Sequence, residues 1–149
     1  MTARVIRLRR GGARFADYVG LRRALWPMSK PTCAREAREV LARRSWAVFV
    51  AIEGDATLGF CEVSLKEYAN GASSSPVGFL EGWFVGALHR RRGVGRALVR
   101  AAEAWARERG CKELCSDTEV ERAWSIAAHR RLGFREAERV VCFVKPLRP

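Results

Sequence analysis

The sequence has 149 residues, 48% hydrophobic and 30% charged, a balance that predicts a soluble globular protein and argues against a disordered chain. No apolar run approaches the roughly 20 residues that a membrane-spanning helix needs, and no secretory leader is recognisable, so we expect a cytoplasmic protein without a membrane partner. The formal net charge of +12 favours an anionic partner, which could be a nucleic acid, an acidic surface or a phosphorylated cofactor.

The period of the apolar residues separates helical from extended segments. The first half predicts a strand over Val5–Leu8, a helix over Phe15–Trp26, a helix from an N-cap at Thr32 to Arg44, and an antiparallel pair over Trp46–Ile52 and Thr57–Leu65. The second half predicts, after a loop over 67–76, a strand over Val77–Val85, a helix over Val94–Arg109, a short strand over Glu113–Ser116, a helix over Trp124–Leu132, and a last strand or short hairpin over Arg135–Val144. No linker or repeat divides these elements, so we expect one mixed α/β domain over residues 1–149.

The five cysteines are scattered and odd in number, which argues against a disulfide framework. The one close pair, Cys111 and Cys115, would stand about 13 Å apart along a strand, too far for a disulfide. No second Cys/His pair accompanies them, so we expect buried thiols and no metal site.

Two glycine positions indicate contact between backbone and ligand. Gly82 lies inside a predicted strand, where glycine favours a bulge or a close backbone approach. The run Arg90–Arg96, of sequence RRRGVGR, lies between that strand and a long helix, where glycines, unpaired backbone N–H groups and the helix dipole can hold a pyrophosphate. The spacing does not fit a P-loop, and Leu98 stands where a dinucleotide fingerprint needs glycine or alanine.

The remaining pattern, [Q/R]-x-x-G-x-[G/A] over Arg90–Gly95, resembles the acetyl-CoA pyrophosphate motif of the GNAT superfamily of N-acetyltransferases. The resemblance implies the acyl-CoA N-acyltransferase fold: a central, mostly antiparallel sheet with a β-bulge and a V-shaped splay, flanked by about four helices. It implies acetyl-CoA as co-substrate, with no metal. The pantetheine would bind the backbone of Trp83, Phe84 and Val85, and the pyrophosphate would bind Arg91, Arg92, Gly93, Val94, Gly95 and Arg96.

A closer resemblance covers nearly the whole chain. Its motifs are Gly20-Leu21-Arg22-x-x-Leu25-Trp26-Pro27, Tyr68-x-Asn70-Gly71, Ser74-Ser75-Pro76-Val77, Phe79-Leu80-Glu81-Gly82-x-Phe84-Val85, Ser116-Asp117-Thr118 and Glu138-Arg139-Val140. Together they resemble the aminoglycoside 6′-N-acetyltransferases, which implies acetylation of the 6′-amino group and aminoglycoside resistance. The resemblance implies a homodimer, and it assigns substrate contacts to Trp26, Glu81, Asp117, Glu138 and a neighbouring subunit's Tyr68.

The predicted chemistry is direct attack of a neutral amine on the thioester in a ternary complex. Most of an alkyl amine is protonated near neutral pH, so a base is needed. We expect Glu81, directly or through a water, to take the proton and Asp117 to orient the amine. A backbone N–H of Trp83 or Phe84 would polarise the carbonyl.

The chain departs from the superfamily pattern at two positions. His129 stands where many members have a tyrosine that protonates the leaving thiolate; it could donate a proton or be a plain helix-face residue. Arg122 stands where related enzymes often place an asparagine against the cofactor.

Each predicted substrate contact also has a structural alternative. Glu81 could face solvent, Asp117 could cap a turn, and Glu138 could pair with an arginine. Trp26 could be core packing at a helix end, and Tyr68 a loop aromatic.

Other functions remain open at this point. A GNAT enzyme could acetylate a polyamine, a peptide or a protein N-terminus, or could have lost activity. A basic nucleic-acid-binding module is a further alternative, although no nucleic-acid-binding motif supports it, and we expect no specific nucleic-acid partner.

Overall fold

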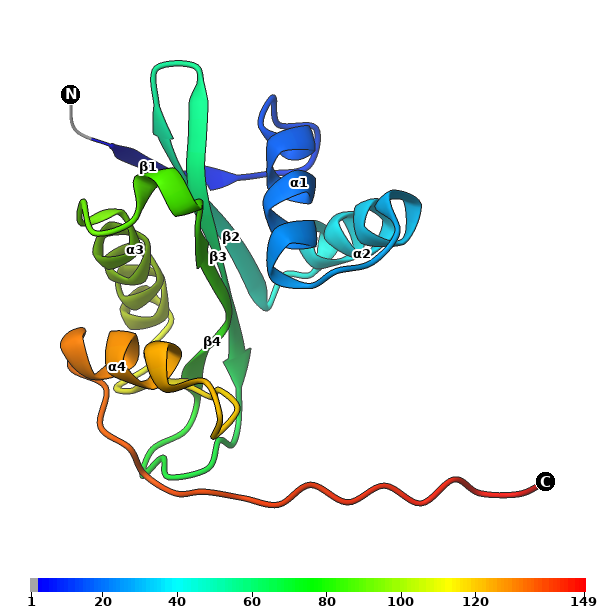
Figure 1. Ribbon diagram of the computed structural model, residues 1–149. Helices are drawn as coiled ribbons and strands as arrows, with labels where there is room; N and C mark the ends of the chain where they lie inside the picture. The colour runs from blue at the N-terminus through cyan, green and yellow to red at the C-terminus, as the bar shows by residue number, and fades with distance from the viewer. Residues whose placement is uncertain (1–2) are drawn as a thin grey trace. The chain divides into compact units, whose positions relative to one another are not determined.

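A computed structural model describes residues 3–149 and divides the chain into two compact units, one ending at Asp117 and one running from Thr118 to Pro149 (Figure 1). The larger unit contains β1 (Arg4–Leu8), α1 (Phe15–Leu25), α2 (Lys30–Ala42), β2 (Trp46–Glu53), β3 (Ala56–Lys66), β4 (Val77–Val85), the 3₁₀ turn η1 (Ala87–His89), α3 (Val94–Glu108) and β5 (Leu114–Ser116). The smaller unit contains α4 (Ala123–Arg131). The predicted mixed α/β fold is confirmed. None of the helices within residues 3–149 is both long and apolar enough to cross a bilayer.

The described residues form one five-stranded sheet in the order β1-β2-β3-β4-β5. The first four strands are antiparallel neighbours, and β5 runs parallel to β4. The centre of β3 is buried on both faces, so its polar residues Glu62 and Ser64 lie within the protein and need partners there.

Helices cover both faces of this sheet (Figure 1). α1 and α2 lie on one face and α3 on the other, and α3 turns a continuous apolar stripe inward. The buried residues of that stripe are Val94, Leu98, Val99, Ala102, Trp105 and Ala106.

A buried polar cluster joins α1 to β3. The Glu62 carboxylate, 1% exposed, accepts hydrogen bonds from the Tyr18 hydroxyl and from Arg22 Nε, both at 2.5 Å. Burial and the adjacent carboxylate raise the pKa of Tyr18 far above its ordinary value. Burial acts to lower the pKa of Arg22, but its hydrogen bond and attraction to Glu62 outweigh burial and raise it. The core therefore holds a charged pair in which each partner satisfies the other.

The start of α2 differs from the prediction. Its N-cap is Ser29, whose backbone is extended and whose hydroxyl accepts a hydrogen bond from the Thr32 amide. Thr32, the predicted cap, lies within the first turn. Pro31 precedes it, at a position where the backbone N–H that proline lacks would have no partner within the helix. Two hydroxyl residues three positions apart could each cap this helix, and the proline favours the earlier one.

The predicted strand over Arg135–Val144 is wrong for this chain. Residues 134–149 follow α4 without regular structure, and the smaller unit contains no strand within its described residues. Val141, Phe143 and Val144 are 77–92% exposed. Their β-branched and aromatic side chains give the segment strand propensity, but a strand forms only against a partner edge, and its own unit offers none.

The Arg22–Glu62 pair leads to a stability prediction. Arg22→Met leaves a buried carboxylate without its counter-ion, so we expect the free energy of unfolding to fall by about 3–5 kcal/mol. Tyr18→Phe removes one hydrogen bond and should cost about 1–2 kcal/mol. Urea denaturation followed by circular dichroism measures both, with the exposed neighbour substitution Arg23→Met as control. A loss below about 1 kcal/mol for Arg22→Met would contradict the assignment.

Candidate active site

The centre of the candidate site is a bulge in β4. Glu62 of β3 pairs with Gly82 and the next residue, Val63, pairs with Leu80, so Glu81 is the extra residue. A Cβ on Gly82 would collide with the indole of Trp26. The bulge predicted from Gly82 is confirmed, and glycine is required there because an aromatic side chain packs directly on the backbone.

Beyond the bulge, one edge of β4 has no strand beside it among the described residues. β5 pairs with β4 only from Gly78 to Leu80, and its last residue is Ser116. Trp83, Phe84 and Val85, the residues predicted to bind pantetheine, lie on this stretch and are half-buried. Their backbone groups on that edge are suited to an extended ligand, which could hydrogen-bond to them as another strand would.

The N-terminus of α3 presents unpaired donors. Gly93 is the N-cap with φ 81°, and Arg91 also has a positive φ of 62°. The first helical bond from this cap is Ala97 N–H to the Gly93 carbonyl, 3.0 Å, which leaves the preceding amides of Val94, Gly95 and Arg96 without intrahelical partners. No side chain caps this end, so the donors and the positive helix end suit an anion.

The strand edge and the helix start lie side by side. A Cβ on Gly95 would approach the Trp83 indole at 3.0–3.3 Å, closer than ordinary contact. Gly95 therefore lets the first turn of α3 pack on the strand that carries Trp83. A single extended ligand can contact both.

The arginines of the RRRGVGR run divide into two groups. Arg90 donates to the Val85 carbonyl at 2.9 Å, and Arg92 pairs with Glu53 at 3.1 Å. Arg91 and Arg96 are exposed, and within residues 3–149 neither forms an ion pair. These two are the side chains best suited to bind phosphate, whereas Arg90 and Arg92 brace the loop.

The Glu81 carboxylate is held in a defined position. Its Oε1 accepts a hydrogen bond from the Ser64 hydroxyl at 2.7 Å and lies 3.3 Å from the Lys66 ammonium. The Glu81 side chain is 20% exposed, so it is a partnered group at the edge of the site and not a plain solvent-facing residue. Sequence reasoning missed Ser64 and Lys66; their alternation on β3, opposite the bulge, was the available indication.

Three residues predicted to contact substrate lie near the bulge in β4. Trp26 packs on Gly82 and has its ring centre 4.9 Å from the Arg22 guanidinium carbon. Leu80 of β4 and Ser116 of β5 are register partners in the parallel pair. Glu81 directly follows Leu80 and Asp117 directly follows Ser116, so the two acidic residues occupy equivalent positions on neighbouring strands. The larger unit thus combines an aromatic wall with two acidic groups.

The loop before β4 is anchored by a carboxylate. Glu113 accepts hydrogen bonds from the Ser73 amide at 2.9 Å and from the Ser74 hydroxyl, and these bonds lower the pKa of Glu113. Tyr68, on the same loop, is 72% exposed.

Two residues considered at the sequence level belong to the smaller unit. Glu138 lies exposed in the segment after α4, whereas Glu81 and Asp117 belong to the larger unit. His129 bonds through Nδ1 to the Ser125 carbonyl at 2.7 Å and packs edge-on against Phe134, contacts typical of a helix-face histidine.

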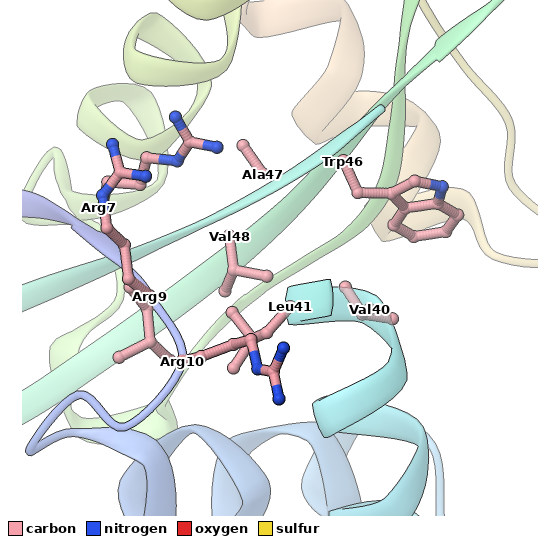
Figure 2. A pocket seen from close by; sticks show the side chains of 9 residues that line it. Arg7, Arg9, Arg10, Val40, Leu41, Trp46, Ala47 and Val48 are labelled. Carbon is pink, nitrogen blue, oxygen red and sulfur yellow. The ribbon is translucent and has the colours of Figure 1, made fainter. Parts of the chain in front are cut away.

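A separate hollow of about 260 Å³ lies between β1, α2 and β2 (Figure 2). Its lining residues are Arg7, Leu8, Arg9, Arg10, Val40, Leu41, Trp46, Ala47 and Val48. Figure 2 shows the guanidinium groups of Arg7 and Arg9 away from that of Arg10, so the charges do not converge on one point. None of the residues predicted for catalysis, substrate or cofactor lines this hollow.

Comparison with known proteins agrees with this geometry. The model of the Acetyltransferase (GNAT) family matches residues 16–134. An aminoglycoside N(6′)-acetyltransferase type 1 from Stenotrophomonas maltophilia is 49% identical over 136 residues, 90% of this chain and 88% of the relative. One from Klebsiella aerogenes is 44% identical over 139 residues, 89% of this chain and 90% of the relative.

A solved structure shares the fold over the same length. AAC(6′)-Iy in complex with the bisubstrate analogue CoA-S-monomethyl-acetylneamine superposes with a TM-score of 0.92 at 34% identity, covering 99% of this chain and 100% of that one. The chain therefore belongs to the GNAT family of acetyltransferases and, within it, to the aminoglycoside N(6′)-acetyltransferases.

Proposed function

We propose that this chain transfers the acetyl group of acetyl-CoA to the 6′-amino group of aminoglycosides and so confers resistance to them. The observation that carries the proposal is the bulge at Glu81. Glu81, braced by Ser64, directly precedes Gly82, on which Trp26 packs, at the point where the open edge of β4 begins. The relatives named above, at 44–49% identity, support the same acceptor.

Acetyl-CoA would bind along the open edge of β4 and the start of α3. The backbone of Trp83, Phe84 and Val85 would hold the pantetheine arm. The amides of Gly93–Arg96 and the side chains of Arg91 and Arg96 would hold the pyrophosphate. Arg92, although paired with Glu53, remains a contact in this proposal through its loop backbone.

The reaction is a direct transfer in a ternary complex. The neutral amine nitrogen attacks the thioester carbonyl carbon, the N–C bond forms, the C–S bond breaks, and CoA leaves as a thiolate. Glu81 accepts the proton that the amine loses, directly or through a water, while Asp117 orients the amine. A backbone N–H of Trp83 or Phe84 stabilises the developing charge on the carbonyl oxygen.

The acceptor site would extend to the aromatic and acidic residues around it. Trp26 forms a wall against the aminoglycoside, and Glu138 contributes a further carboxylate for its ammonium groups. A partner copy contributes Tyr68, whose high exposure leaves its ring accessible.

The working form is a homodimer in this proposal. The support is the segment after α4, where Val141, Phe143, Val144 and Leu147 are strongly exposed, a concentration of apolar surface that favours burial against a second copy. We also propose that residues 1–149 act as one catalytic domain, since the GNAT match spans both compact units. Its compartment would be the cytoplasm, where acetyl-CoA is available and the free thiols remain reduced.

Replacing the base tests the mechanism. Glu81→Gln should lower kcat at pH 7.5 by about 100-fold or more, the usual contribution of a positioned base. The deficit should shrink as pH rises, because more of the amine is then already neutral. Thiol release from acetyl-CoA with a 6′-amino aminoglycoside measures the rate, and Glu67→Gln, an exposed carboxylate nearby in sequence, is the matched control. Equal rates for Glu81→Gln and wild type would reject the base role.

Removing the two uncommitted arginines tests the phosphate site. The double variant Arg91→Ala/Arg96→Ala should raise the KM for acetyl-CoA about tenfold or more, because each of the two substitutions removes a charge-assisted hydrogen bond to the pyrophosphate. Arg100→Ala, exposed one turn further along α3, should leave the KM within about twofold. If Arg100→Ala weakens acetyl-CoA binding as much as the double variant, general basicity and not this site holds the coenzyme.

Polar substitution in the exposed segment tests the dimer. Sedimentation velocity should give a dimer for the wild type and a monomer for Phe143→Asp/Val144→Asp, because a charge cannot be buried unpaired in an apolar interface. Lys145→Ala, in the same segment, should remain dimeric. A monomeric wild type would refute the homodimer itself.

A further inference from the structure

A lysine lies where a site for polycations would not be expected to have one. The Lys66 ammonium is 3.3 Å from Glu81 Oε1 and 3.7 Å from the centre of the Phe79 ring. The ring face attracts a cation, so two independent contacts hold this ammonium in place. Its partner is Glu81, the carboxylate that accepts the proton of the acceptor amine in the proposed reaction.

The two carboxylate oxygens of Glu81 are not equivalent. Oε1 is shared by Lys66 and the Ser64 hydroxyl, whereas in the described part of the chain neither a hydrogen bond nor an ion pair occupies Oε2. An acceptor amine can therefore bind Oε2 without displacing Lys66. The lysine would then remain within a few ångströms of the reacting nitrogen.

The other charged or titratable side chains on the elements around Glu81 are Asp17, Tyr18, Arg22 and Arg23 of α1, Cys61 and Glu62 of β3, Glu67 after β3, Cys115 of β5 and Asp117 after β5. Tyr18, Arg22 and Glu62 satisfy one another in the core. Burial raises the pKa of the Cys115 thiol, so it is neutral near pH 7. Glu67 and Asp117 are exposed carboxylates, and Lys66 is thus the cation that pairs with Glu81.

We propose that Lys66 is a positioning residue that keeps the bound acceptor amine in its neutral, nucleophilic form. This inference rests on the proposed function and adds a residue to it. A like charge at about 4–6 Å disfavours the protonated form of an amine. Each unit by which Lys66 lowers the pKa of the bound ammonium gives about ten times more neutral amine near pH 7. Lys66 also offsets the charge of Glu81, which limits how tightly the unreactive ammonium is held.

The proposal predicts opposite changes in two kinetic constants. In Lys66→Met, the ammonium binds Glu81 without repulsion from the lysine, so the KM for the aminoglycoside should fall about two- to fivefold. At pH 7, kcat should fall about tenfold because less bound amine is neutral, and it should return toward the wild-type value near pH 9.5. Lys66→Arg, which keeps the charge, should restore both constants. Lys112→Met, an exposed lysine in the same unit, should change neither.

The experiment measures kcat and KM for a 6′-amino aminoglycoside from pH 6 to 9.5, with Kd from calorimetry at pH 7. The partly exposed pair contributes little to stability, so Lys66→Met should fold; Lys66→Gln is a second neutral variant. A kcat that falls equally at every pH, or a KM that rises, overturns the proposal. If the wild type releases no thiol with any aminoglycoside, the proposed function fails instead. If the wild type is active and Lys66→Met matches it at every pH, the role of Lys66 fails alone.

Discussion

The β-bulge at Glu81 is the constraint on which the rest of the site depends. One extra residue in β4 interrupts the strict alternation of side chains, so that Phe79, Glu81 and Gly82 all contact groups on the α1 side of the sheet. Without it, strict alternation from Phe79 would turn residue 82 toward the α3 side, away from Trp26. The bulge also falls where β5 stops pairing, so the acidic group and the open strand edge begin at the same place.

Charge is separated within this basic protein according to what each region must bind. At the start of α3, Arg91 and Arg96 have no acidic partner among residues 3–149, which suits them to the phosphates of a coenzyme. At the bulge, carboxylates predominate and the one nearby lysine is paired. A net charge of +12 therefore does not conflict with a cationic acceptor, because the acceptor meets the local field of Glu81 and Asp117 and not the average of the surface.

The elements predicted from the sequence are those whose cause is local. The glycines at 82, 93 and 95, the long amphipathic stripe of α3 and the paired strands all left periodic or conformational patterns that could be read directly. The pairing of Ser64 and Lys66 with Glu81, and that of Arg22 with Glu62, was not predictable, because the partners lie 15 to 40 residues apart and depend on strand register. The segment after α4 shows that a local pattern can also mislead. Its residues favour a strand, but a strand forms only where a neighbouring strand edge is available to pair with it.

The stability of the core and the geometry of the site involve the same residues. Glu62 is the register partner of Gly82, Arg22 pairs with Glu62 and stacks on Trp26, and Trp26 packs on Gly82. These contacts form a closed ring, so a change at any member shifts the aromatic wall relative to the bulge. A buried ion pair is weak evidence for stability by itself. The role of the Arg22–Glu62 pair is therefore to fix one orientation of the Arg22 guanidinium, which in turn orients the Trp26 indole. An apolar replacement that preserved stability would still lose the planar group against which Trp26 is aligned.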